Sequence, residues 1–186
     1  MDSHTLHIVR AGLEQADELG YVHAVSWNAA YQDILPAPFL AGFTPEKRAA
    51  LFRRNLPERE KNAEEFYLFR SGRSPAGMAI LGDAEDRDIP DDTGEIGAFY
   101  FLPDTWGTGL AQEGMAYCLA RLRERGSTQA MVWVLAENRR ARRFYEKTGF
   151  HFDGGRHAFS LSLPADEIKP NDIRMELRYS RELTHG

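Results

Sequence analysis

One stretch of the sequence, residues 95–112, constrains the fold of this chain more than any other. Residues 95–102 are strongly apolar and end at Pro103, and glycines follow at positions 107 and 109. Residues 110–125 then place apolar side chains on one helical face. The sequence therefore predicts a buried strand that leads through a tight glycine turn into a helix.

The glycine turn indicates how a ligand could be held. Small residues at positions 107, 109 and 111 let the backbone come close to a ligand, and the first N–H groups of the following helix have no partner within it. Such a turn is typical of phosphate-binding sites. Gln112 stands where a dinucleotide-binding GxGxxG pattern has its third glycine, and no GK[ST] follows, so both of those nucleotide-binding folds are disfavoured.

The rest of the chain alternates strand and helix patterns around this stretch. Alternating or continuous apolar runs bounded by turn residues predict strands, and apolar residues at every third or fourth position predict helices. Strands are expected at 6–10, 66–70, 77–81, 95–102 and 130–135, and the stretches 150–152, 158–163 and 173–179 can supply the final strands. Helices are expected at about 13–31, 45–55, 110–125 and 137–148.

Length and charge limit the domain count and the partners. A chain of 186 residues suits one α/β domain with a core and is short for two, so we expect a single domain over 1–186. A formal net charge of -5 gives no general attraction to phosphate backbones, which argues against a nucleic-acid partner. The acidic stretch 82–94 is interpreted as a solvated connection, since its carboxylates lack the spacing of a calcium loop.

Cysteine and histidine usage argues against a disulfide and against a metal. Cys118 is the only cysteine, and it lies on the apolar stripe of helix 110–125, so we expect a buried apolar side chain there. The six histidines show no ligand spacing, so no metal is expected. The N-terminus lacks the apolar run of a signal peptide, and no membrane partner is indicated. We expect a cytoplasmic protein.

A second motif, at 134–150, completes the pattern. It reads VLAENRRARRFYEKTGF, with Asn138 after a buried strand and Tyr145 in a helix that stops at Gly149. Together with the first motif it resembles the two signatures of the GNAT acetyltransferases: strand, Pro, [Q/R]xxGx[G/A] turn and helix, then strand, Asn and an AxxFYxxxGF helix. The resemblance covers about residues 95–150. The sequence departs from it at Trp106, which occupies the usual Gln or Arg position.

The resemblance implies an α/β (α+β) fold. One GNAT-like domain would contain a central mixed, mostly antiparallel twisted sheet of six to seven strands, flanked by about four helices. The strand before Pro103 would splay from its neighbour at the centre of the sheet. The cofactor-binding core would span about 95–150, and the acceptor-side elements would be about 13–56 and 150–180.

The resemblance also implies an acyltransferase that moves an acetyl group from acetyl-CoA to a primary amine of a small acceptor, by direct attack in a ternary complex. Acetyl-CoA would be a cosubstrate, and no metal would be needed. A protein N-terminal or lysine acetyltransferase and a non-catalytic acetyl-CoA-binding sensor are alternatives. Retention of both Asn138 and Tyr145 argues against the sensor. A homodimer is left open.

Motif positions imply the cofactor-binding residues. Backbone groups of Phe99 and Phe101 would pair with the pantetheine amides, and the turn 107–112 would hold the pyrophosphate. One or two of the arginines in 139–143 could pair with the 3′-phosphate, although such a run is usually a solvated helix face. The residues expected to bind the cofactor are Phe99, Tyr100, Phe101, Gly107, Thr108, Gly109, Leu110, Ala111, Gln112, Asn138, Arg142 and Tyr145.

Asn138 and Tyr145 are seven residues apart, or two helical turns. On a helix both would line the same cofactor, and Ala141 and Phe144 would face roughly the other way, toward the sheet. The Tyr145 hydroxyl is expected to donate to the CoA sulfur as a general acid.

The general base and the acceptor site are expected outside these motifs. Glu95 is the candidate base, with a solvated strand-end charge as the alternative, and an α-amine with a pKa near about 8 would need no strong base. Trp27 and Tyr31, one helical turn apart, are expected either to line the acceptor site or to pack in the core.

Overall fold

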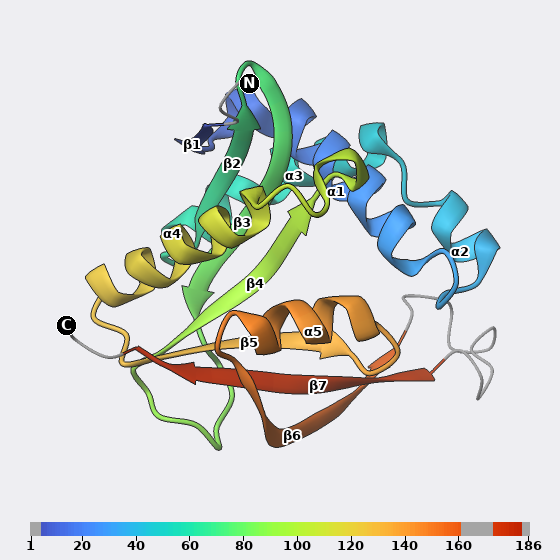
Figure 1. Ribbon diagram of the computed structural model, residues 1–186. Helices are drawn as coiled ribbons and strands as arrows, with labels where there is room; N and C mark the ends of the chain where they lie inside the picture. The colour runs from blue at the N-terminus through green and yellow to red at the C-terminus, as the bar shows by residue number, and fades with distance from the viewer. Residues whose placement is uncertain (1–4, 161–172, 184–186) are drawn as a thin grey trace.

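The computed structural model describes residues 5–160 and 173–183 and shows one mixed sheet with helices on both faces (Figure 1). The spatial order of the strands is β1-β2-β3-β4-β5-β7-β6. The strands are β1 (Leu6–Arg10), β2 (Glu65–Ser71), β3 (Ser74–Asp83), β4 (Thr93–Phe101), β5 (Gln129–Leu135), β6 (His151–Ser160) and β7 (Ile173–Glu182). The helices are α1 (Ala16–Tyr31), α2 (Ala37–Ala41), α3 (Pro45–Lys61), α4 (Leu110–Glu124) and α5 (Arg139–Lys147), with short 3-10 turns η1 (Leu13–Gln15) and η2 (Pro103–Thr105).

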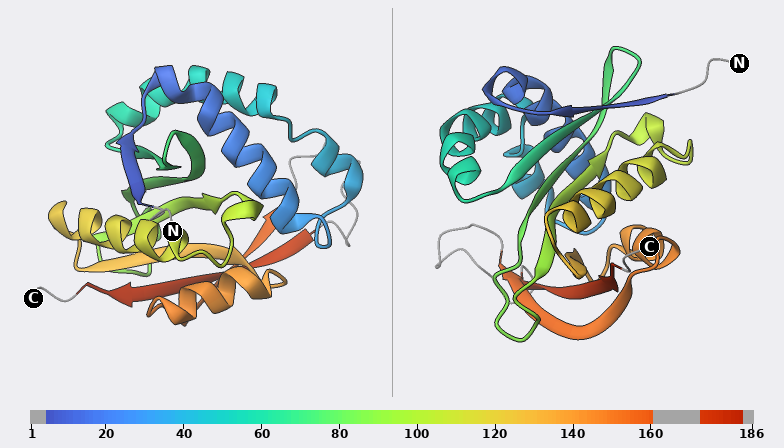
Figure 2. Two further views of the ribbon diagram at one scale, coloured as in Figure 1. Left: turned by 45° about the horizontal axis from the view of Figure 1, so that its top comes forward. Right: turned by 90° about the vertical axis from the view of Figure 1, so that its left-hand side faces the viewer.

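Each face of the sheet has its own core. The right-hand view of Figure 2 separates α1 and α3 on one side from α4 and α5 on the other. On the first side, Leu19 and Phe52 are among the helical side chains that pack with Leu68 and Met78 of the sheet. On the second side the apolar stripe of α4, including the fully buried Cys118, packs with β4 and β5 residues. The prediction that Cys118 is a buried apolar side chain is confirmed.

β4 and β5 form the parallel pair of this sheet, and they stay together for only three residues, from Thr93↔Gln129 to Glu95↔Met131. Beyond that point β4 continues along β3 and β5 along β7, so the two strands diverge. The Leu102 N–H donates to the Ala76 carbonyl on the β3 side at 2.8 Å. Because backbone groups alternate between the two edges of a strand, those of Phe99 and Phe101 lie on the edge that faces the gap.

The predicted fold class is confirmed: the sheet is mixed and mostly antiparallel, and its two central strands splay. Two details differ from the prediction. The short helix α2 was not predicted, since its sequence contains Pro38 and follows Pro36. Pro36 precedes the helix and Pro38 lies in its first turn, where a missing N–H costs little. The helix predicted to end near residue 55 runs to Lys61, with Pro57 inside it.

The C-terminal strands also differ in extent. The stretches 150–152 and 158–163 were predicted as separate strands, and the structure joins them in β6, with an irregularity in register between Phe152 and Arg156. Residues 161–163 lie outside the described residues.

The acidic connection between β3 and β4 is anchored rather than simply solvated. Arg178 on β7 is 5% exposed, and its guanidinium donates two hydrogen bonds to Asp88, at 2.7 and 2.8 Å. It also donates to Asp86 at 3.3 Å and to Asp153 at 2.9 Å. A buried cation with three carboxylate partners holds this loop against the end of the sheet.

Gly20 sets the closest approach of α1 and α3. A Cβ at position 20 would lie 2.5 Å from the Ala49 amide nitrogen and 2.7 Å from the Pro45 carbonyl oxygen, both of which are backbone atoms of α3. At Gly12, also with negative φ, an added Cβ would meet nothing within 4 Å.

We expect Gly20→Ala to destabilise the protein by about 1–3 kcal/mol, because the two helices must move apart to accept the methyl group. Gly12→Ala is the matched control and should change the free energy of unfolding by less than about 0.5 kcal/mol. Urea unfolding followed by circular dichroism measures both. Equal stability of the two variants would contradict the close packing of α1 on α3.

Candidate functional site

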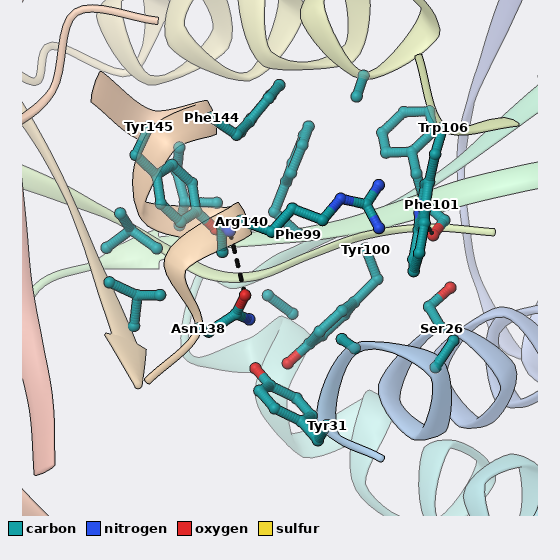
Figure 3. Close-up of a pocket in the computed structure, with 18 of the residues that line it drawn as sticks. Ser26, Tyr31, Phe99, Tyr100, Phe101, Trp106, Asn138, Arg140, Phe144 and Tyr145 are labelled. Atoms are coloured by element: carbon teal, nitrogen blue, oxygen red, sulfur yellow. Dashed lines mark hydrogen bonds between the residues drawn. The ribbon is translucent and has the colours of Figure 1, made fainter. Parts of the chain in front are cut away.

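A cavity of about 410 Å³ opens where β4 and β5 separate (Figure 3). Its walls come from α1, β4, β5, the turn after β4, the first turn of α4, and α5. The structure brings together in this lining seven of the residues predicted from the sequence: Tyr31, Phe99, Tyr100, Phe101, Ala111, Asn138 and Tyr145.

The glycine turn lies at one end of this cavity. Gly107 and Gly109 have φ of +80° and +96°, and a Cβ on either would meet nothing within 4 Å, so the turn is open on its outer side. Gly109 is the N-cap of α4, and its carbonyl accepts from the N–H groups of Gln112 and Glu113. The N–H groups of Leu110 and Ala111 are therefore the first free donors of the helix, which favours an anion there.

Asn138 starts α5 without belonging to it. Its side-chain Oδ1 accepts from the Ala141 N–H at 3.1 Å, the dashed line in Figure 3, and its φ of -76° and ψ of 69° are not helical. The helical face that meets the cavity is consequently set by Ala141, Phe144 and Tyr145. Phe144 stacks on Phe99 with ring centroids 5.6 Å apart. Phe144 faces the sheet as predicted, but Ala141 and Phe144 line the same cavity as Asn138 and Tyr145, so the prediction that they lie on the opposite face is wrong.

Three tyrosines meet around the cavity. Tyr145 is 6% exposed, and burial raises the pKa of its hydroxyl, so the proton stays on the oxygen throughout the neutral range. Burial also raises the pKa of Tyr31, against the opposing effect of hydrogen bonding with Tyr100 and Asn138. Figure 3 shows the Tyr31 and Tyr100 hydroxyls close together below Asn138.

Glu95 lies beside the cavity and not in its lining. Its Oε1 is 3.9 Å from the position that a Cβ on Gly97 would take, and Gly97 does line the cavity. Burial raises the pKa of Glu95 to about 7, and the neighbouring charges of Asp86, Glu64 and Glu85 contribute to the rise. A carboxyl group with this pKa can accept a proton near neutral pH.

Of the turn predicted to hold the pyrophosphate, only Ala111 is in the cavity lining, and Gly107, Thr108, Gly109, Leu110 and Gln112 lie outside it. Arg142 and Trp27 are also outside the lining, and both have other partners. The Arg142 side chain donates from Nε to the Tyr179 hydroxyl and from a terminal nitrogen to the Ala136 carbonyl, both at 3.0 Å, and so ties α5 to β7 and to the preceding loop. Trp27 is 8% exposed and stacks on Phe43 with ring centroids 4.2 Å apart. Trp27 belongs to a core cluster beneath Tyr31.

Sequence reasoning did not single out Arg140 from its arginine run, and it missed Trp133 and Ser26 of the lining. Arg140 places its guanidinium over the Trp106 ring, and the Trp106 indole N–H donates to the Phe101 carbonyl at 2.8 Å. Trp133 lines the cavity from β5, and Ser26 lines it from α1. The alternation along β5 could have indicated Trp133, whereas nothing in the sequence distinguishes Arg140 from the arginines around it.

The described residues meet neither the requirements of a membrane-spanning helix nor those of a metal site. No helix within 5–160 or 173–183 is long and apolar enough to cross a membrane. In the same part of the chain, no group of three or more His, Cys, Asp or Glu side chains is arranged to hold a metal ion.

Comparisons with known sequences match this geometry. Residues 27–150 fit the sequence pattern of the acetyltransferase (GNAT) family. An uncharacterised N-acetyltransferase of Mycobacterium tuberculosis is 30% identical over 145 residues, which cover 77% of this chain and 88% of the relative. The mycothiol acetyltransferase of Saccharopolyspora erythraea is 33% identical over 84 residues, which cover 41% of this chain and 28% of that protein.

Solved structures share the fold at low sequence identity. The PaiA N-acetyltransferase of Thermoplasma acidophilum, crystallised with coenzyme A, superposes with a TM-score of 0.72 at 14% identity, covering 96% of this chain and 99% of that one. YncA of Salmonella typhimurium, a putative acetyltransferase solved with acetyl-CoA, gives a TM-score of 0.68 at 14% identity, covering 98% and 96%. The chain therefore belongs to the GNAT family and is an acetyl-CoA-dependent N-acetyltransferase.

Proposed function

We propose that this chain transfers the acetyl group of acetyl-CoA to the primary amine of a small acceptor, by direct attack of the amine within a ternary complex. One observation supports the proposal: the unpaired edge of β4, Tyr145, and Trp106 and Ala111 on either side of the glycine turn all line one cavity. An edge strand with free backbone groups, an anion-binding turn and a buried proton donor suit the amides, the phosphates and the sulfur of one extended thioester.

The pantetheine arm fits the gap between β4 and β5 as a short extra strand. Phe99 offers both its N–H and its carbonyl on this edge, while the Phe101 carbonyl already accepts from Trp106 and leaves mainly the Phe101 N–H for a ligand. The backbone of residues 107–112 would hold the pyrophosphate, and Asn138 and Tyr145 would lie along the arm.

The chain's own residues can carry the proton transfers. The amine nitrogen attacks the thioester carbonyl carbon, and the Phe101 N–H, the group that Phe101 keeps free on this edge, would stabilise the oxyanion. As the C–S bond breaks, Tyr145 donates its proton to the departing sulfur. The proton released by the amine passes to Glu95 through a chain of water molecules, because Glu95 lies outside the cavity lining and its pKa matches neutral pH.

The shape and charge around the cavity favour a small acceptor that arrives as a cation. Residues 29–33 at the end of α1 cover the cavity beside Tyr31, which limits access for a folded polypeptide. Asp33 lies in the cavity lining, and Glu95 with its acidic neighbours lies beside the cavity. These negative charges attract an ammonium group before the amine loses its proton. The single cysteine fits a cytoplasmic setting.

Turnover tests the proposal directly. We expect wild-type protein to release CoA from acetyl-CoA in the presence of at least one member of a panel of small amines, and Tyr145→Phe to lower kcat about 10²-fold while the affinity for CoA stays unchanged. Tyr21→Phe removes a hydroxyl from an exposed position on α1 and should have no effect. Tight CoA binding with no turnover on amines or peptides would instead support a sensor.

The pH dependence of kcat/KM tests Glu95. The base acts when deprotonated, so kcat/KM should rise with pH through an apparent pKa near 7. Glu95→Gln should remove this rising limb of the pH profile and lower kcat/KM about 10²-fold. Glu85→Gln removes a neighbouring negative charge and should move the limb to lower pH. A limb that persists in Glu95→Gln would assign the titration to the amine itself.

Variants of Trp27 and Tyr31 test whether each residue packs in the core or binds the acceptor. We expect Trp27→Ala to cost about 3–5 kcal/mol of stability, because it empties a stacked core position. Tyr31→Phe keeps the ring, so it should cost no more than about 1.5 kcal/mol and raise the acceptor KM with little change in acetyl-CoA affinity. Denaturant unfolding and steady-state kinetics measure the two effects. An unchanged KM in Tyr31→Phe would remove this residue from the acceptor site.

A further inference from the structure

The contact between Arg140 and Trp106 joins the two halves of the site at the exposed end of the cavity. Arg140 comes from the first turn of α5 and Trp106 from the turn that precedes α4, and the guanidinium carbon lies 3.0 Å from the centre of the indole ring. Both side chains line the cavity, and Figure 3 shows Arg140 reaching across it toward Trp106.

The Arg140 cation has no anionic partner in the described part of the chain. No ion pair or side-chain hydrogen bond of residues 5–160 and 173–183 involves its guanidinium, whereas Arg121, Arg142 and Arg178 all have such partners. Partial burial lowers the pKa of Arg140, and no neighbouring carboxylate opposes that effect. Arg140 is exposed at the mouth of the cavity, and an unpaired guanidinium in a cavity lining is suited to an anionic ligand.

The Trp106 ring is fixed in place. Its indole N–H donates to the Phe101 carbonyl at 2.8 Å, which holds the ring against the end of β4. Gly107 follows directly, and the free N–H groups of Leu110 and Ala111 lie at the end of the same turn. The ring therefore positions the guanidinium beside the anion-binding end of α4.

A second polar group at this end also lacks a partner. Ser26 is 2% exposed, its Oγ has no hydrogen-bond partner, and it lines the cavity from α1. Figure 3 shows the Ser26 hydroxyl below Trp106 and Phe101. An unpaired buried hydroxyl in the same lining as an unpaired cation indicates that the cavity can hold a polar ligand.

We propose that Arg140, held on the Trp106 ring, binds the pyrophosphate of the acetyl donor and supplies the side-chain charge that Trp106 itself cannot provide. This inference rests on the proposed function, since it assigns a ligand to the donor end of the same cavity. A guanidinium can make two parallel hydrogen bonds to phosphate oxygens while its face stays on the ring. The ring orients the cation and the free N–H groups of α4 complete the site.

Two acetyl donors test whether Arg140 contacts phosphate: acetyl-CoA, and S-acetylpantetheine, which carries no phosphate. We expect Arg140→Gln to weaken CoA binding in calorimetry, and to lower kcat/KM for acetyl-CoA, by about 10- to 100-fold. The kcat/KM for S-acetylpantetheine should stay unchanged. Arg143→Gln makes the same charge change on the next turn of α5, outside the lining, and should shift CoA affinity by less than about threefold.

Trp106→Leu tests the role of the ring. It should reduce CoA affinity about as much as Arg140→Gln does. The double variant should bind CoA as tightly as the single variant with the lower affinity, because the two residues act as one unit. Additive losses would overturn the assignment of Trp106 as the support of Arg140.

Three results would overturn the assignment of Arg140: an effect no larger than that of Arg143→Gln, an equal loss with S-acetylpantetheine, or tighter CoA binding in Arg140→Gln. The last result would show that the contact between Arg140 and Trp106 competes with CoA binding. If wild-type protein neither binds CoA nor turns over acetyl-CoA, the proposed function itself fails. If wild-type protein does both and Arg140→Gln behaves as wild type, only this inference fails.

Discussion

The separation of β4 from β5 is the constraint on which the rest of the structure depends. After the third pair, at Glu95↔Met131, the facing edges of the two strands have no strand partner, yet each strand is still held on its outer edge, β4 by β3 and β5 by β7. The strands can neither close the gap nor move apart freely. Backbone groups inside a protein require partners, so an edge left open in this way is stable only beside water or an extended ligand with its own amides.

Side chains on both faces keep this gap from closing. On one face Phe99 stacks on Phe144 of α5, and on the other Tyr100 packs against the aromatic residues at the end of α1. Because neighbouring residues of β4 point to opposite faces, one short segment is fixed from both sides at once. The rings line the cavity as well as support it, so the packing that holds the strands apart also shapes the site.

Local patterns predicted most of the elements and the glycine turn, because each depends on residues close in sequence. The errors came from long-range contacts and from helix phase. Asn138 was treated as part of the helix, and Ala141 and Phe144 were placed on the opposite face; Asn138 only caps α5, and all of these residues line the cavity together with Tyr145. Arg142, expected near the 3′-phosphate, instead donates to the Tyr179 hydroxyl. The acidic loop looked solvated because its cation, Arg178, lies ninety residues away from Asp88. No local pattern carries that pairing.

The two ends of the cavity differ in charge, and this difference gives the reaction a direction. Glu95, with Glu64, Glu85 and Asp86 near it, lies at the start of β4, while Arg140 and the start of α4 lie beyond its other end. Six residues of strand separate Glu95 from Phe101, roughly 20 Å, so at physiological salt each end acts on its own ligand with little influence on the other. Under the proposed function, phosphates would be drawn to one end and an ammonium group to the other. The thioester and the amine would then meet between the two ends, beside Tyr145.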